Sequence, residues 1–212
     1  MLNFCTLFDI NYVDKGLAMY YSLTRHCNNF TLYIFAFDDP TYQILNRLTL
    51  PNVVLIHLNQ LEEFDKELLN VKPLRTKAEY CWTATPSTIL YVIKNYNIPI
   101  CTYIDADLFF YSNPKVLIEE IANNSVLITE HRYTPKYDKS SKFGKYCVQF
   151  ISFKNDNYGL NVLNWWHQKC IEWCYNRVED GKFGDQKYLD NWTTMFANVH
   201  VLKHQGGGIA PW

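Results

Sequence analysis

The sequence predicts one α/β domain in which a mainly parallel, Rossmann-like sheet is flanked by helices. Short apolar runs rich in branched and aromatic residues alternate along the chain with stretches of helical apolar periodicity. This alternation is typical of βαβ units, and several of the apolar runs end at an acidic residue. No repeat or linker divides the 212 residues, which suffice for a single domain with a substantial core.

The first elements follow a strand–helix–strand order. Residues 4–8 (FCTLF) are an apolar run that predicts a strand ending at Asp9, and residues 31–37 (TLYIFAF) predict a second strand. Between them, Asp14 is a suitable N-cap for a helix over 14–26, in which leucines and tyrosines form one apolar face. Because two strands enclose a helix, we expect a parallel βαβ unit at the start of the chain.

The middle of the chain predicts a helix followed by the central strand of the sheet. Thr85 is a favourable N-cap and Pro86 a favourable first helical residue, so the helix should cover 86–95. Strand 100–104 follows, and its carboxyl end leads into Asp105. The other expected strands cover 53–58, 126–129, 146–153 and 199–202, and the other expected helices cover 41–48, 60–69, 114–121, 157–177 and 186–192.

Two carboxylates directly follow this central strand. Asp105 and Asp107 are two residues apart, so in an extended chain they project to the same side. Two carboxylates about 4 Å apart repel by roughly 4 kcal/mol at an effective dielectric of about 20, and a Mg²⁺ or Mn²⁺ ion completed by phosphate oxygens would neutralise them. An Asp-x-Asp triplet alone is as often a solvated loop. Its place at the carboxyl end of a strand, where open α/β sheets bind ligands, favours a metal site.

Composition excludes several classes of protein. Hydrophobic residues make up 48% and charged residues 19% of the chain, which rules out disordered and fibrous proteins. A formal net charge of −1 argues against general nucleic-acid binding. The seven scattered cysteines lack a CxxC pair, which predicts reduced thiols, and no apolar run approaches the length of about 20 residues that spans a membrane. We therefore expect a cytoplasmic protein that contacts a membrane at its periphery at most.

A basic loop is expected after strand 126–129. Residues 132–145 contain five cations and the single acid Asp138. Such a loop beside an acidic metal site is suited to close over a diphosphate, although a merely solvated loop explains the composition equally well. Glu130 and His131, at the end of the strand, are candidate ligand contacts.

An ordered set of motifs resembles the nucleotide-sugar glycosyltransferases of the GT-A fold, and more closely glycosyltransferase family 8 and related bacterial surface-polysaccharide glycosyltransferases. The motifs are Tyr-Ile-Asp-Ala-Asp at 103–107, Gly-Asp-Gln at 184–186 and the closing His-Gln-Gly-Gly-Gly-Ile-Ala-Pro-Trp at 204–212. The resemblance covers 1–212 as a single GT-A domain, with further residues expected after Trp212. It implies transfer of a sugar, with retention, from a nucleotide-diphosphate sugar such as a UDP-sugar to a saccharide or lipid-linked acceptor in polysaccharide biosynthesis.

The resemblance also implies roles for individual residues. Asp105, Asp107 and His204 would bind Mn²⁺ or Mg²⁺, and Asp105 would also lie near the donor ribose. Asp185 and Gln186 would line the sugar pocket as the catalytic pair. Asp185 is equally suited to cap helix 186–192, and His204 alone is often a strand-end residue. Three further residues are implied in donor binding: Asp9 at the base and ribose, Lys77 at the sugar or phosphate, and Gly207 at the phosphates.

Two positions depart from the resemblance, and two alternative functions stay open. Ala210 stands where the family usually has a phosphate-binding lysine, for which Lys142 or Lys145 is a candidate replacement. Cys147 follows Tyr146 where an asparagine-containing donor loop is common. A catalytically inactive binding or scaffold protein of the same fold is one alternative. A sugar-1-phosphate nucleotidyltransferase is the other, although residues 1–16 lack the glycine-rich basic loop usual in that class.

Overall fold

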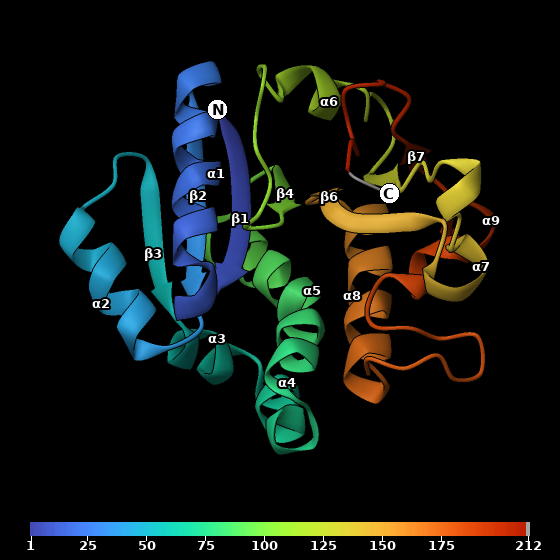
Figure 1. Ribbon diagram of the computed structural model, residues 1–212, viewed down its shortest axis with the longest axis horizontal. Coiled ribbons are helices and arrows are strands. Elements are labelled where there is room, and N and C mark those ends of the chain that lie inside the picture. Colours follow the sequence, from blue (N-terminus) through green and yellow to red (C-terminus); the bar gives the residue numbers. More distant parts are fainter. Residues whose placement is uncertain (211–212) are drawn as a thin grey trace.

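The computed structural model describes residues 1–210, which form one mixed sheet of seven strands in the order β3-β2-β1-β4-β6-β5-β7 (Figure 1). This confirms the α/β class and the single sheet. The strands are β1 (Leu2–Phe8), β2 (Phe30–Ala36), β3 (Val53–His57), β4 (Ile100–Ile104), β5 (Val126–Glu130), β6 (Tyr146–Lys154) and β7 (Val199–Val201).

Helices cover both faces of this sheet. The α-helices are α1 (Val13–His26), α2 (Asp39–Leu48), α3 (Leu58–Phe64), α4 (Lys66–Val71), α5 (Lys77–Tyr96), α6 (Lys115–Glu119), α7 (Ser140–Phe143), α8 (Asn157–Glu172) and α9 (Trp192–Met195). Short 3₁₀ helices cover Ile10–Tyr12, Lys72–Leu74, Pro135–Tyr137 and Lys187–Asn191. No helix within residues 1–210 is long and apolar enough to cross a membrane.

Most strands of the sheet are parallel, as expected. Strands β3, β2, β1 and β4 run parallel to one another, and β7 runs parallel to β5. Strand β6 is antiparallel to both of its neighbours, β4 and β5. The chain builds β1 to β3 outward on one side and then returns to place β4 on the other side of β1. This reversal leaves a crevice between the carboxyl ends of β1 and β4, where doubly wound sheets bind ligands.

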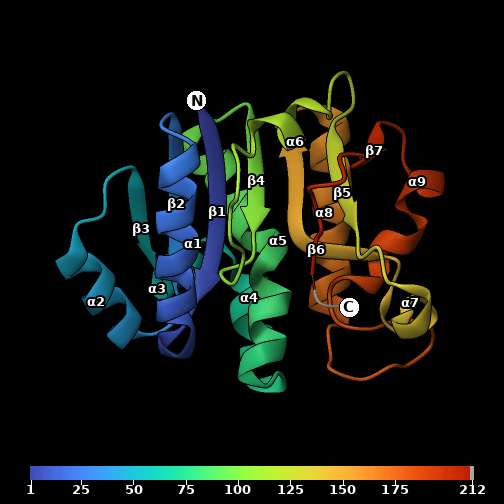
Figure 2. The same ribbon diagram turned by 45° about the horizontal axis from the view of Figure 1, so that its top comes forward.

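Alternating side chains of the strands fill two hydrophobic layers. On β2, Tyr33 and Phe35 point into the layer that α5 and α8 cover, whereas Leu32 and Ile34 point into the layer that α1 covers. Helices α5 and α8 pack against each other, and Figure 1 and Figure 2 show them side by side across one face of the sheet. Because both faces are buried, the strands read as continuous apolar runs.

The helix before β4 begins nine residues earlier than the sequence analysis expects. Thr76, and not Thr85, is its N-cap, because the Thr76 side chain and Glu79 form a reciprocal capping box. Pro86 therefore lies inside α5. Pro86 has no N–H to donate to the Trp82 carbonyl. The hydroxyl of the preceding Thr85 donates to the carbonyl of Cys81 at 3.3 Å.

Several other boundaries differ from the expected ones. Asp65 divides the expected helix 60–69 into α3 and α4, because its carboxylate caps α4 through the Leu68 N–H. Asp14 lies in the first turn of α1 and does not cap it. The expected helix 157–177 ends at Glu172, and residues 187–191 are 3₁₀ rather than α-helical. Pro211 and Trp212, which end the expected closing motif, lie outside the described residues.

Candidate functional site at the carboxyl ends of β1 and β4

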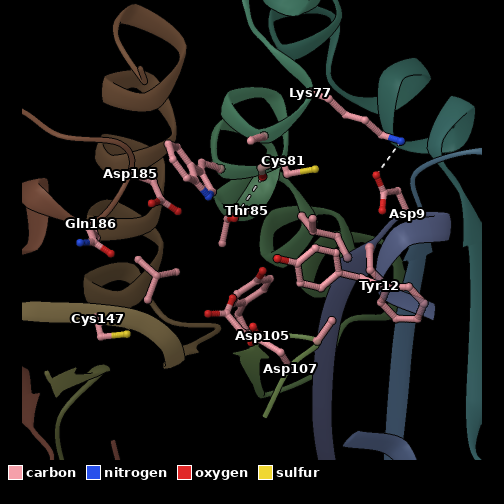
Figure 3. A pocket seen from close by; sticks show the side chains of 17 residues that line it. Asp9, Tyr12, Lys77, Cys81, Thr85, Asp105, Asp107, Cys147, Asp185 and Gln186 are labelled. Carbon is pink, nitrogen blue, oxygen red and sulfur yellow. Dashed lines mark hydrogen bonds and ion pairs between the residues drawn. The ribbon is translucent and has the colours of Figure 1, made fainter. Parts of the chain in front are cut away.

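The crevice between β1 and β4 contains a cavity of about 440 Å³. Asp9 follows β1 and Asp105 follows β4, so the switch in strand order alone brings these two predicted residues to one cavity. Asp107, Asp185 and Gln186 line the same cavity. In Figure 3, Asp105 and Asp107 rise from the end of β4, Asp185 and Gln186 lie on one side, and Asp9 lies on the other.

Three carboxylates of this cavity have no cationic side chain beside them in the described part of the chain. They are Asp105, Asp107 and Asp185. Asp185 is 6% exposed, and burial together with the charge of Asp105 raises its pKa to about 8. Burial and the charge of Asp107 likewise raise the pKa of Asp105 to about 7, although the Tyr103 hydroxyl opposes this shift. The cavity therefore gathers three carboxyl groups without a cationic partner, and Asp105 and Asp185 hold their protons up to near-neutral pH.

The segment of Asp185 is held from helix α8. The indole N–H of the fully buried Trp166 donates to the Asp185 carbonyl at 2.9 Å. The preceding residue, Gly184, has a φ of +50°, a backbone conformation that glycine adopts without strain. Gln186 does not make a side-chain cap for the next helical turn, and its amide donates to the Phe143 carbonyl at 2.8 Å. Gln186, and not Asp185, is the N-cap residue of the following 3₁₀ helix. The alternative prediction, that Asp185 caps a helix over 186–192, is therefore wrong.

The opposite wall of the cavity is neutralised by Lys77. Its ammonium group lies 2.5 Å from a carboxylate oxygen of Asp9 and 3.3 Å from one of Asp38. The hydrogen bond to Asp9 is the main reason why the pKa of Lys77 lies above its ordinary value. Asp9 also accepts from the Asn11 backbone at 2.9 Å, which fixes the turn after β1. Lys77 thus contacts Asp9, the predicted base-binding residue, and this ion pair forms one wall of the cavity (Figure 3).

Sequence reasoning missed Tyr12 and Thr85 as residues of this cavity. Tyr12 projects into it from the end of the 3₁₀ turn, and Thr85 enters from α5 because that helix starts earlier than expected. Trp82, for which the sequence left cleft lining and core packing open, also lines the cavity. The signal for Tyr12 was its place three residues after a strand that ends in a carboxylate. The signal for α5 was the spacing of Thr76 and Glu79, which matches a capping box.

The closing segment that carries His204 and Gly207 lies against the end of β5. The Arg132 guanidinium donates to the carbonyls of Leu202, His204 and Gly207 at 2.7–2.8 Å. From the other side, Glu120 accepts the backbone N–H groups of Lys203 and His204, both at 2.8 Å. A side chain at position 207 would meet Leu202 at 2.3 Å, so glycine permits this close approach.

The structure does not bring His204 into one metal-binding group with Asp105 and Asp107. Within residues 1–210, no three His, Cys, Asp or Glu side chains lie close enough together to hold a metal ion. His204 and Gly207 do not line the cavity. Of the proposed replacements for the missing lysine, Lys145 pairs with Glu130 at 3.0 Å and Lys142 lies over the Phe143 ring, and neither lines the cavity.

Two curated proteins of Bacillus subtilis (strain 168) match nearly the whole chain. YfnF is 33% identical over 217 residues, which cover 99% of this chain and 71% of YfnF. YfnD is 31% identical over 217 residues, which cover 99% of this chain and 68% of YfnD. The chain belongs to the family of YfnD and YfnF. Both relatives are named as uncharacterized proteins, and no family model matches the chain.

Solved structures show the fold of this YfnD/YfnF family member. The glycosyltransferase GlyE of Streptococcus pneumoniae TIGR4 superposes with a TM-score of 0.60 at 15% identity, over 95% of this chain and 45% of GlyE. The bifunctional glycosyltransferase WbbM superposes with a TM-score of 0.61 at 15% identity, over 95% of this chain and 38% of WbbM. The galactosyltransferase LgtC, crystallised with donor and acceptor sugar analogues, superposes with a TM-score of 0.61 at 13% identity, over 94% of this chain and 73% of LgtC. The chain thus spans less than half of GlyE and WbbM. The expected GT-A fold is confirmed.

Proposed function

We propose that this chain is a metal-dependent glycosyltransferase that moves a sugar from a nucleotide-diphosphate sugar, a UDP-sugar in the first instance, to a saccharide or lipid-linked acceptor. One observation carries the proposal. Asp105, Asp107 and Asp185 meet at the switch point of a GT-A fold without a neutralising cation in the described chain. Asp185 is buried and Asp105 half-buried, and a site built only for stability would pair such carboxylates, because an unpaired buried ion costs several kcal/mol.

The donor chemistry of the site fits a hard divalent cation. Asp105 and Asp107 offer carboxylate oxygens at one rim of the cavity, and their mutual repulsion raises the pKa of Asp105. Mg²⁺ and Mn²⁺ bind one or two carboxylates and complete their shell with phosphate oxygens, which matches this pair. When bound, the ion supplies charge neutralisation for the departing diphosphate. His204 joins this set only after the segment 202–208 moves, and an imidazole ligand would favour Mn²⁺ over Mg²⁺.

The chain's own residues divide the remaining tasks. Tyr12 offers an aromatic face and Asp9 a carboxylate at the wall where the nucleoside would lie. Lys77, now paired with Asp9 and Asp38, lies within reach of a phosphate or sugar hydroxyl. Asp185 and Gln186 form the wall opposite and orient the sugar through hydrogen bonds. Gly207 would let the closing backbone approach the phosphates. We propose retention at the anomeric carbon from family likeness alone.

Nucleotide-dependent thermal stabilisation tests the proposal. UDP, UDP-glucose, UDP-galactose, GDP and CDP are added to the wild type with and without Mn²⁺. A nucleotide at about 100 times its dissociation constant should add roughly 2.7 kcal/mol to the free energy of unfolding. We expect a Mn²⁺-dependent shift with uridine nucleotides that disappears in Asp107→Asn. Asp14→Asn is the matched control, because Asp14 is an exposed acid on α1.

Three results separate the proposal from the two alternatives. No stabilisation by any nucleotide, in a folded protein, overturns the donor site and favours the scaffold function. Stabilisation without any slow hydrolysis of a nucleotide sugar favours an inactive binding protein. Stabilisation by a nucleoside triphosphate and a sugar 1-phosphate, with release of pyrophosphate, favours the nucleotidyltransferase.

A further inference from the structure

A second cavity of about 510 Å³ adjoins the first. The two cavities share Asp105, Asp107, Cys147 and Gln186, so a molecule in the second cavity meets the proposed reaction centre directly. Its outer part is built by His131 and by residues of the basic loop 132–145, namely Tyr133, Tyr137, Lys139 and Phe143. The loop is ordered by contacts to the site, because Gln186 donates to the Phe143 carbonyl and Lys187 to the carbonyls of Ser140 and Ser141.

Aromatic rings form much of the wall of this second cavity. His131 and Tyr133 stack with ring centroids 4.7 Å apart and an interplanar angle of 13°. Burial lowers the pKa of His131 below its ordinary value, so its ring is neutral near pH 7. Phe143 and Phe183 pack together on another part of the wall, with centroids 4.6 Å apart. Planar apolar faces of this kind suit the C–H faces of sugar rings.

The acids and the lysine of this lining come from different segments of the chain. Asp105 and Asp107 are the acids of its lining, and Lys139 is its lysine. Lys136 and Lys142 lie in the same loop, and all three lysines are exposed without a carboxylate partner in the described chain. Asp138, the acid between them, accepts the Ser140 N–H at 2.8 Å. The acidic part of the lining therefore follows β4, whereas the basic part belongs to the loop after β5.

We propose that this second cavity binds an acceptor saccharide that carries a negative group, a phosphate or a carboxylate, at the end held by Lys139. This rests on the proposed glycosyltransferase function. The anionic group at Lys139 turns the other end of the acceptor, with its free hydroxyl, toward Asp105 and Asp107. In the transfer, a bond forms between that hydroxyl oxygen and the anomeric carbon, the bond from this carbon to the diphosphate oxygen breaks, and the hydroxyl proton leaves to solvent or to the diphosphate.

Matched neutral and anionic probes test the inference on protein saturated with UDP and Mn²⁺. One pair is a galactose trisaccharide and a galacturonic acid trisaccharide. The other is N-acetylglucosamine linked to farnesol and the same sugar linked to farnesyl diphosphate. Titration calorimetry measures each dissociation constant in the wild type, in Lys139→Gln, and in the triple variant Lys136→Gln/Lys139→Gln/Lys142→Gln. Lys66→Gln, an exposed lysine on α4, is the matched control.

We expect the anionic member of at least one pair to bind roughly three- to tenfold more tightly than its neutral partner, because each exposed ion pair contributes only modestly to affinity. The pair that shows the preference identifies the source of the charge, a free acidic glycan or a lipid-linked diphosphate. The preference should shrink in Lys139→Gln, vanish in the triple variant and persist in Lys66→Gln.

Two results overturn the inference. The first is equal binding, or no binding, of the neutral and anionic members of both pairs. The second is a preference that survives in the triple variant. Binding of UDP with Mn²⁺ is measured beforehand on the same protein. If UDP does not bind, the proposed donor site fails; if UDP binds but charge does not affect acceptor binding, only the acceptor inference fails.

Discussion

Two buried carboxylate sites in this chain differ in how they are satisfied. Asp65, between α3 and α4, accepts from His167 at 2.7 Å, from Ser87 at 2.6 Å and from the Leu68 N–H at 3.0 Å. Burial opposes its ionisation, but these hydrogen bonds outweigh burial and hold the pKa of Asp65 below its ordinary value. At the cavity, burial and neighbouring charge dominate, and the pKa values of Asp105 and Asp185 are raised to about 7 and about 8.

The difference separates a carboxylate that stabilises the fold from carboxylates that are kept for a ligand. Asp65 joins α4, α5 and α8 through one side chain, and its partners complete its hydrogen bonding within the protein. Asp105 has the Tyr103 hydroxyl as a partner, and Asp185 has the Thr85 hydroxyl and nearby backbone N–H groups, but these bonds do not offset burial and the neighbouring charge. The ionised form therefore carries a free-energy cost that a bound cation would remove. Perturbed carboxyl groups of this kind in a cavity are typical of functional sites.

Removal of the satisfied carboxylate should give the largest effect. Asp65→Ala leaves His167 and Ser87 in the core without their acceptor, and we expect the free energy of unfolding to fall by about 3–5 kcal/mol. Urea denaturation monitored by tryptophan fluorescence measures the change. A loss below about 1 kcal/mol would show that solvent replaces the lost bonds. Asp14→Ala serves as the exposed control, for which a change within about 0.5 kcal/mol is expected.

Neutralisation of one cavity carboxylate should change stability in the opposite direction. Asp105→Asn removes a charge that the folded apoprotein holds at a cost, so at pH 8 we expect the metal-free variant to be more stable than the wild type. The gain should be on the order of 1–2 kcal/mol, because each pKa unit corresponds to about 1.4 kcal/mol and the half-buried side chain is partly screened. Urea denaturation in EDTA measures it. Lower stability of the variant would contradict the comparison.

The pH dependence of the two sites should also differ in sign. The stability from Asp65 is complete above its unfolded pKa near 4 and is lost as the pH falls below it. Asp105 instead holds a proton in the folded protein up to about pH 7 that the unfolded chain releases near pH 4. The free energy of unfolding of the metal-free protein should therefore fall between about pH 4 and pH 7, and Asp105→Asn should flatten this slope. Thermal unfolding across pH 4–8 measures both.

Much of the fold could be predicted from the sequence because strand and helix signals are local. The alternation that ends at Asp9, Asp38 and Asp105 reflects buried parallel strands, and the structure contains each of them. The start of α5 could not be settled from Pro86 alone, because the nearby capping box at Thr76 competes with it. Tertiary packing decided the outcome, since Tyr80, Ala84 and Thr83 of the added turns are buried.

The site was predictable only where residues follow strands. Asp9 and Asp105 converge because parallel strands end at one edge, a rule that the sequence can apply. The place of Asp185 depends on Trp166 in a different helix, and such long-range packing leaves no local signal. The hydrogen bonds from Arg132 to the closing segment could not be predicted from the sequence either, because the acceptors are backbone carbonyls about 70 residues away.

Metal affinity should respond to the raised pKa values. Protons compete with Mn²⁺ for Asp105, so its dissociation constant should increase by up to tenfold for each pH unit below about 7 and level off above it. Electron paramagnetic resonance of free Mn²⁺ at pH 5.5–8 measures this constant directly. Asp107→Asn should weaken binding at every pH. An affinity independent of pH over this range would place the metal away from Asp105.

Arg132 is a cation whose hydrogen bonds are satisfied within the protein, as those of Asp65 are. Its substitution should give the smallest effect on stability. Its guanidinium is satisfied by three carbonyls rather than by a carboxylate, and its backbone lies at a φ of +54°. In Arg132→Gln, water replaces these half-buried bonds, so we expect the free energy of unfolding to fall by only about 1 kcal/mol. The closing segment loses its anchor, however, and stabilisation by UDP with Mn²⁺ should decrease more than that by Mn²⁺ alone. Arg25→Gln is the control, and an equal loss of both stabilisations would mean that Arg132 supports the fold without positioning the segment.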